Sequence, residues 1–244
     1  MSKGYGQFCP LAKAAELLCE RWTMILVREL VAGSRRFNDL RRGLPRISPT
    51  LLSRRLHQLA QAGVVQRLVD DDGTQSYELT CAGRELAPMV QFMGTWGHRW
   101  VGSHLEEQDL DMGLLMWDIR RGVDAGKFPR QRVVVQFELI EAPTGWADWW
   151  LVSENGEIDL CLEDPGYEVD LLVRCTPRTL TAVWLCRRSV ADAEGARELQ
   201  ILGNSSLRKR FPEWLQGSPL ARLGEASLRA DPVLQELVAP NPIS

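Results

Sequence analysis

Residues 48–62, SPTLLSRRLHQLAQA, predict a short helix with one apolar face and one polar face. Ser48 is a favourable N-cap residue, Pro49 suits the first helical position, and Gly63 predicts the end of the helix. The apolar positions recur at the spacing of a buried helical stripe: Leu52, Leu56, Leu59 and Ala60.

The other face of this helix carries side chains that hydrogen-bond to phosphates or base edges when a helix lies in the major groove of DNA. They are Thr50, Ser53, Arg54, Arg55 and Gln58. We predict groove contacts for Ser48, Thr50, Ser53 and Arg54, and phosphate or flanking contacts for Arg36, Arg46 and Arg55.

The segments on either side complete a DNA-binding module. Residues 34–44 predict a short helix, and the few residues that separate it from the next helix give helix-turn-helix spacing. Residues 64–69 and 75–79 alternate as strands around Asp70-Asp71-Asp72-Gly73, which is a hairpin turn signal. Together these elements predict a winged helix-turn-helix domain.

Charge is distributed unevenly along the chain. Residues 1–69 contain twelve Lys and Arg against four Asp and Glu, a net charge of +8, whereas the whole chain has −3. Residues 105–244 contain fifteen basic and 23 acidic residues, a net charge of −8. A basic module in an otherwise acidic protein indicates a polyanion as partner of the first segment, and the second segment is no nucleic-acid surface.

With these features, the chain resembles the HxlR-type bacterial transcriptional regulators over about residues 8–100. The resemblance rests on ordered short motifs at residues 9–14, 21–23, 28–30, 36–40, 47–49, 52–56, 62–65 and 77–80. It implies a homodimeric winged-helix domain, with the dimer built from the N-terminal segment and the helix after the wing. The acidic wing tip, residues 70–72, departs from this pattern, because carboxylates repel phosphates.

The length of 244 residues predicts a second domain. We place the winged-helix domain at 1–104, a second domain at 105–220 and a tail at 221–244. Residues 82–100 predict a helix that needs a partner for its long apolar stripe, either the other subunit or the second domain. The stripe consists of Leu86, Met89, Val90, Met93, Trp96 and Trp100.

The second domain has an α+β pattern: a helix at 111–123, four strands in an antiparallel meander, two helices, a strand and a last helix at 204–214. This order resembles the sterol carrier protein type domain, which implies a sheet covered by helices and an apolar tunnel for a hydrophobic ligand. The tunnel candidates, which are equally suited to an ordinary core, are Phe137, Trp149, Leu151, Leu160, Leu171, Val173, Leu180 and Trp184.

Catalysis and metal binding have little support in the sequence. The six cysteines lack metal-ligand spacing, and the three histidines all precede residue 105, so we expect no enzyme activity, no metal and no cofactor. The resemblance implies that Cys9 is a candidate thiol sensor, as the N-terminal cysteine is in some members of the family, and here it precedes a helix that begins at Pro10, where the helix dipole favours the thiolate. Buried cysteines are also common core residues. Without a membrane span or secretory signal, we expect a cytoplasmic protein.

These features predict a dimeric, double-stranded-DNA-binding regulator that responds to a hydrophobic small molecule. Two alternatives remain open. One is a redox regulator that acts through Cys9. The other is a lipid-binding carrier that uses its first domain only for dimerisation.

Overall fold

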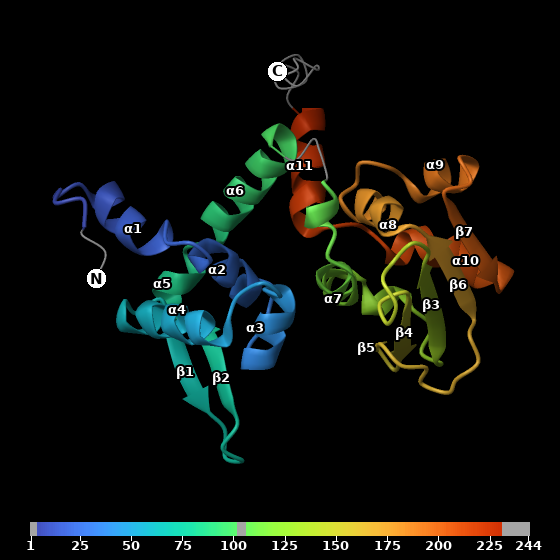
Figure 1. The fold of residues 1–244 in the computed structure, drawn as a ribbon, viewed down its shortest axis with the longest axis horizontal. Helices are drawn as coiled ribbons and strands as arrows, with labels where there is room; N and C mark the ends of the chain where they lie inside the picture. Colours follow the sequence, from blue (N-terminus) through green and yellow to red (C-terminus); the bar gives the residue numbers. More distant parts are fainter. Residues whose placement is uncertain (1–3, 102–105, 231–244) are drawn as a thin grey trace. The chain divides into compact units, whose positions relative to one another are not determined.

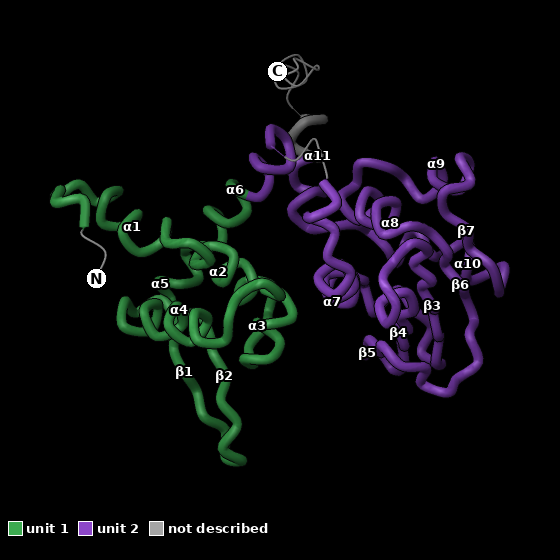
Figure 2. The backbone as a smooth tube through the Cα atoms, viewed as in Figure 1, with its two compact units in different colours: residues 1–93 green, residues 94–244 purple. Residues whose placement is uncertain are grey.

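The computed structural model describes residues 4–101 and 106–230. The chain divides into two compact units, residues 1–93 and 94–244 (Figure 2). Each unit has its own hydrophobic core. The division falls within one helix, α6 (Ala87–Trp100), and therefore earlier than the domain boundary that we predicted. That predicted boundary, between residues 104 and 105, lies outside the described residues.

Unit 1 is a set of helices followed by a two-stranded hairpin (Figure 1). The structure bears out the predicted order of a helix-turn-helix and a wing. The elements are α1 (Pro10–Leu18), α2 (Thr23–Val31), α3 (Phe37–Gly43), α4 (Pro49–Gln61), β1 (Val65–Val69), β2 (Gln75–Leu79), α5 (Cys81–Arg84) and the first half of α6.

Two helices of unit 1 differ from the predictions. Helix α3 begins three residues later than expected, because residues 35–36 are held beside the wing. The backbone carbonyl oxygen of Arg35 accepts the backbone N–H of Tyr77 at 2.9 Å, and Arg36 forms a β-bridge with Ser76. The helix expected at 82–100 is two helices, α5 and α6. Thr80 caps α5, since its hydroxyl accepts the N–H of Gly83 at 3.1 Å.

Unit 2 contains α7 (Met112–Gly122), a five-stranded sheet and further helices. The strands are β3 (Val133–Leu139), β4 (Asp148–Glu154), β5 (Glu157–Cys161), β6 (Leu171–Cys175) and β7 (Leu199–Gly203). The later helices are α8 (Pro177–Trp184), α9 (Val190–Gly195), α10 (Ser205–Trp214) and α11 (Pro219–Ala230), and short 3-10 turns lie at Glu107–Asp109 and Ala125–Lys127. The predicted order from α7 to α10 is confirmed, whereas the predicted tail begins as helix α11.

The prediction of an antiparallel meander, and of an antiparallel sheet, is wrong for one strand. The strand order is β5-β4-β3-β6-β7, and β6 pairs parallel to β3. Only β3, β4 and β5 form the meander. The reason is that the chain leaves the edge strand β5 through residues 162–170 and returns on the far side of β3, and alternating patterns do not reveal strand neighbours.

One face of this sheet carries the core of unit 2. Phe137, Trp149 and Val173 lie side by side in register on β3, β4 and β6, and all three are buried. Buried side chains of α7, α8, α9 and α10 complete the same cluster. Among the described residues, no helix is long and apolar enough to cross a membrane.

Candidate nucleic-acid interface

Helix α4 is fixed by its own sequence at both ends. The hydroxyl of Ser48 accepts the backbone N–H of Leu51 at 3.2 Å, and Pro49 occupies the first turn. Gly63 follows the C-terminus with a φ of +71°, a left-handed conformation that glycine adopts without strain. The helix buries its leucines in the core of unit 1, and it therefore holds its other face toward solvent.

The structure leaves most of the predicted DNA-contacting residues exposed. Exposed residues in and around α4 are Arg36, Arg46, Ser48, Thr50, Ser53 and Arg54. Ser48, Thr50, Ser53 and Arg54 belong to α4 or its cap, whereas Arg46 precedes the helix and Arg36 lies beside the wing. That these residues contact DNA stays a prediction. Their exposure leaves them accessible for such contacts.

The structure corrects the prediction for Arg55. We expected it on the exposed face of α4, but only 6% of the residue is exposed. Its guanidinium donates to the carbonyl oxygen of Arg21 at 3.0 Å and to the carboxylate of Glu20 at 2.7 Å. Because this cation is buried and paired inside unit 1, it is not a phosphate contact.

A buried carboxylate ties the first helix of the helix-turn-helix to the helix before it. Glu29 is fully buried and accepts hydrogen bonds from Arg28 at 2.6 Å and from the hydroxyl of Ser34 at 3.2 Å. Arg28 also donates to the carbonyl oxygen of Gly43 at 3.1 Å. These bonds connect α2 with the C-terminus of α3, where the turn toward α4 begins.

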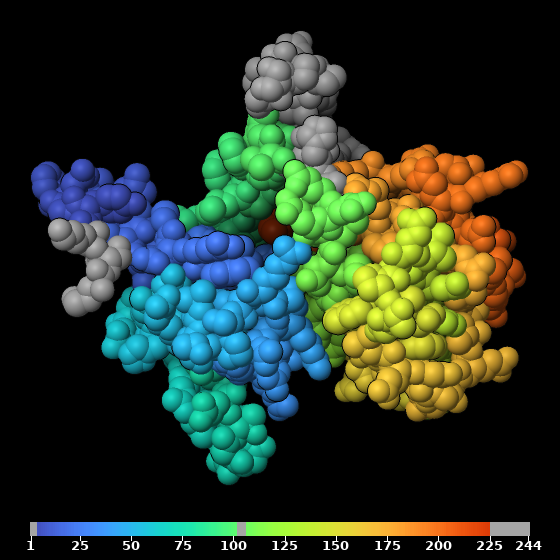
Figure 3. All heavy atoms as spheres, viewed as in Figure 1, coloured from blue at the N-terminus to red at the C-terminus, as the bar shows by residue number. Residues whose placement is uncertain are grey.

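The wing projects from the body of unit 1, as the teal segment in Figure 3 shows. At its tip, the backbone N–H of Thr74 donates to Asp72 at 2.8 Å and, with the positive charge of Arg36, lowers the pKa of this carboxyl group. The lowered pKa favours the charged form of Asp72 and agrees with the expectation that the tip itself does not grip DNA, which stays a prediction.

Three exposed cations near the helix-turn-helix were not predicted as DNA contacts. Arg41 and Arg42 lie in the last turn of α3, immediately before the turn to α4, and Arg67 lies on the exposed strand β1. Their proximity in sequence to the predicted recognition helix was the signal that could have identified them. They add positive charge to the surface near α4.

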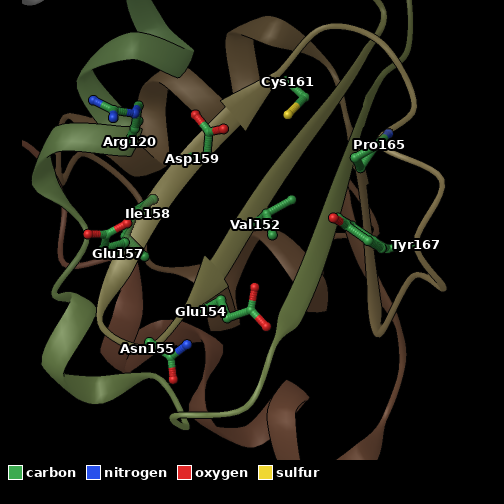
Figure 4. Close-up of a pocket in the computed structure, with 10 residues that line it drawn as sticks. All are labelled: Arg120, Val152, Glu154, Asn155, Glu157, Ile158, Asp159, Cys161, Pro165 and Tyr167. Carbon is green, nitrogen blue, oxygen red and sulfur yellow. The ribbon is translucent and has the colours of Figure 1, made fainter.

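The eight predicted tunnel residues form a packed core. Seven are buried within one cluster in unit 2, and Leu160 is partly buried against it. A cavity of about 570 Å³ lies elsewhere in unit 2, at β4 and β5, and its lining includes Arg120, Glu154, Asp159 and Tyr167 (Figure 4). None of the eight predicted residues lines this polar cavity. The structure therefore favours the interpretation of these residues as core over their interpretation as a tunnel.

Cys9 occupies the N-cap position of α1, where it is half-buried, and its role as a sensor stays a prediction. None of the six cysteines, all of them described, forms a disulfide. Burial raises the pKa of Cys175 to about 12, and burial together with the charge of Asp159 raises that of Cys161, so these thiols are poor candidates for reaction. Within the described residues, no group of three or more His, Cys, Asp or Glu is placed to hold a metal ion.

Residues 17–105 match the family described as HxlR-like helix-turn-helix. YvaP of Bacillus subtilis, an uncharacterized HTH-type transcriptional regulator, is 36% identical over 98 residues, which are 39% of this chain and 91% of YvaP. YdeP of the same organism, also an uncharacterized HTH-type transcriptional regulator, is 32% identical over 38% of this chain and 73% of its own length. The solved structure of the reduced form of the regulator YodB from B. subtilis is 29% identical, covers 41% of this chain and 100% of YodB, and has a TM-score of 0.36.

Proposed function

This chain belongs to the HxlR-like helix-turn-helix family, and we propose that it regulates transcription by binding double-stranded DNA as a homodimer, with α4 in the major groove. The observation that carries the proposal is the face of α4. A capped helix buries its leucines and presents Thr50, Ser53 and Arg54 to solvent. The net charge of +8 over residues 1–69 supplies the attraction to a polyanion.

Binding to DNA is expected to weaken steeply as salt rises, because every phosphate contact releases a condensed counterion. Arg54→Ala should weaken binding to a specific site by about 1 to 3 kcal/mol, if the side chain reads a base edge. The measurement is titration of a duplex from the gene's own promoter region at several salt concentrations, with wild type and variant compared under each condition.

The control is Arg188→Ala, which removes a partly exposed arginine of unit 2 that pairs with Glu198. This variant should bind the duplex as wild type does. Failure of the wild-type protein to bind at low salt would refute the proposed function. Equal affinities of wild type and Arg54→Ala would remove Arg54 from the interface.

We further propose that unit 2 binds an apolar molecule with one polar group by opening the packed core between its sheet and its helices. Two buried polar atoms favour this second function. Neither the hydroxyl of Ser153 nor the indole N–H of Trp184 has a hydrogen-bond partner within the described part of the chain. Both residues are almost fully buried, and Ser153 extends the inner face of β4, opposite Val133 and Ile158. Buried polar groups normally have partners, and a ligand would supply one.

Ser153→Ala is expected to weaken ligand binding about tenfold or less, the loss of roughly one hydrogen bond, without lowering stability. Stability should hold because the variant removes a buried hydroxyl that is unsatisfied in the empty protein. The measurement is fluorescence titration with a dansyl-labelled fatty acid, and the exposed variant Ser205→Ala is the control. If wild type does not bind the probe, or binds it no more tightly than Ser153→Ala does, Ser153 does not have this role.

A further inference from the structure

The buried face of the recognition helix carries a cation that reaches outside the helix. Arg55 of α4 uses all three of its guanidinium nitrogens. Nε donates to the carbonyl oxygen of Arg21 at 3.0 Å, Nη2 to Glu20 at 2.7 Å and Nη1 to Gln58 at 2.7 Å. The first two acceptors belong to the turn between α1 and α2, and the third belongs to α4 itself. The guanidinium therefore joins the turn to the recognition helix.

The turn that Arg55 holds has an unusual backbone. Trp22, at the N-terminus of α2, has φ 79° and ψ −18°, a left-handed conformation that is costly for a bulky side chain. Arg21, whose carbonyl oxygen accepts from Arg55, is the residue immediately before it. A strained conformation persists only where surrounding contacts maintain it. The contacts from Arg55 are of that kind, because they reach both residues that precede Trp22.

The shape of the guanidinium makes this contact directional. It is planar, and its Nε and Nη2 hydrogens present a fixed fork to the carbonyl and the carboxylate. The bond to Gln58 restrains the fork relative to α4. A lysine at position 55 has a single ammonium group and does not reproduce the fork.

We propose that Arg55 and Glu20 form a clamp that positions the recognition helix against the α1–α2 turn, so that DNA affinity depends on an ion pair that itself does not contact DNA. Both are positioning residues, since they act through α4. The inference rests on the proposed binding of DNA by α4. It also gives α1 a route to the DNA-binding surface, because the clamped turn begins directly after this helix.

The direction in which one substitution changes DNA affinity distinguishes a positioning role from a simple effect of charge. Glu20→Gln removes a negative charge from the basic DNA-binding unit, and charge alone therefore predicts tighter binding to DNA. Loss of the clamp predicts weaker binding. Glu16→Gln is the matched control, because Glu16 also lies on the α1 side of the turn and pairs with Lys13 at 3.1 Å, but has no bond to α4 among those described.

The experiment titrates one promoter duplex with Glu20→Gln, Arg55→Gln, their double variant, Arg55→Lys and Glu16→Gln over a range of salt. We expect Glu20→Gln to bind several-fold more weakly than wild type, and Arg55→Gln on the order of tenfold more weakly. Arg55→Lys should not restore wild-type affinity. The double variant should be little worse than Arg55→Gln alone, since both single changes break the same contact.

The salt dependence distinguishes this role from phosphate contact. Arg55→Gln should keep the wild-type slope of log affinity against log salt, whereas loss of one phosphate contact lowers that slope by about 0.9. Thermal unfolding identifies variants that fail to fold. Glu20 is partly exposed, so Glu20→Gln should fold, and the test does not depend on variants that fail to do so.

The proposal is overturned if Glu20→Gln binds DNA as tightly as wild type or more tightly, or if the two single effects simply add in the double variant. A wild-type protein that does not bind DNA would overturn the proposed function, and this inference with it. A wild-type protein that binds while Glu20→Gln is unimpaired would overturn the inference alone.

Discussion

Phe92→Glu is expected to convert the proposed homodimer to a monomer. Phe92 lies on α6 with 69% of the residue exposed, and Met93 and Trp96 of the same helix are about half exposed. Contiguous apolar surface of this kind marks an interface, and aromatic side chains at interface centres contribute most of the binding energy. A buried unpaired carboxylate at this position should cost about 2 kcal/mol or more, which raises the dimer dissociation constant at least about 30-fold.

Light scattering at micromolar concentration measures the effect against a monomer mass of 27.6 kDa. Gln91→Glu is the matched control, because it adds the same charge at the adjacent exposed position, which points away from Met93 and Trp96. That variant should stay dimeric. A monomeric wild type would show that the apolar face of α6 is not a dimer interface, and a dimeric Phe92→Glu would place the interface elsewhere.

The helix-turn-helix and the wing were predictable because their signals are local. A cap, an apolar stripe and a glycine stop define α4 within sixteen residues, 48–63, and the same positions have those roles in the structure. The wing strands likewise follow from alternation around a turn of three aspartates and a glycine. Each pattern describes a segment in which the nearest neighbours in sequence are also the neighbours in space.

Arg55 shows why one residue of the candidate site was misplaced. Its charge suggested exposure, yet it lies three residues after Leu52 and four before Leu59, on the buried side of the helical stripe. Spacing alone therefore indicated burial, whereas charge indicated solvent. What makes burial possible is Glu20, which is 35 residues away in sequence and supplies the compensating charge. A distant partner of this kind leaves no local pattern.

The predicted strand arrangement in unit 2 was wrong for a similar reason. All of its strands were located from alternation, but β6 has the same alternation whether it continues the meander beside β5 or crosses to β3. Strand order depends on contacts between segments far apart in sequence. The tunnel prediction had the same weakness, because an apolar sheet face is equally consistent with a cavity and with a filled core.

Gly83→Ala is expected to lower the free energy of unfolding of unit 1 by about 2 to 4 kcal/mol. A Cβ atom at Gly83 would lie 2.1 Å from the carbonyl oxygen of Val64. This oxygen accepts the backbone N–H of Thr80 at 3.0 Å and its hydroxyl at 3.2 Å, which closes the base of the wing. The carbonyl is part of the backbone and cannot rotate away as a side chain would, so the methyl group must displace the strand or the helix.

Gly97→Ala separates this clash from the general effect of replacing a helical glycine. A Cβ atom at Gly97, within α6, would meet no heavy atom of the described residues within 4 Å, and alanine should stabilise that helix by about 0.5 to 1 kcal/mol. Urea denaturation followed by circular dichroism compares the two variants with wild type. Opposite shifts of the unfolding midpoint are expected, because the same added methyl group meets a backbone oxygen at one site and open space at the other. An unchanged midpoint for Gly83→Ala would mean that the base of the wing can open without loss of stability, and the wing would then not be held rigidly beside α4.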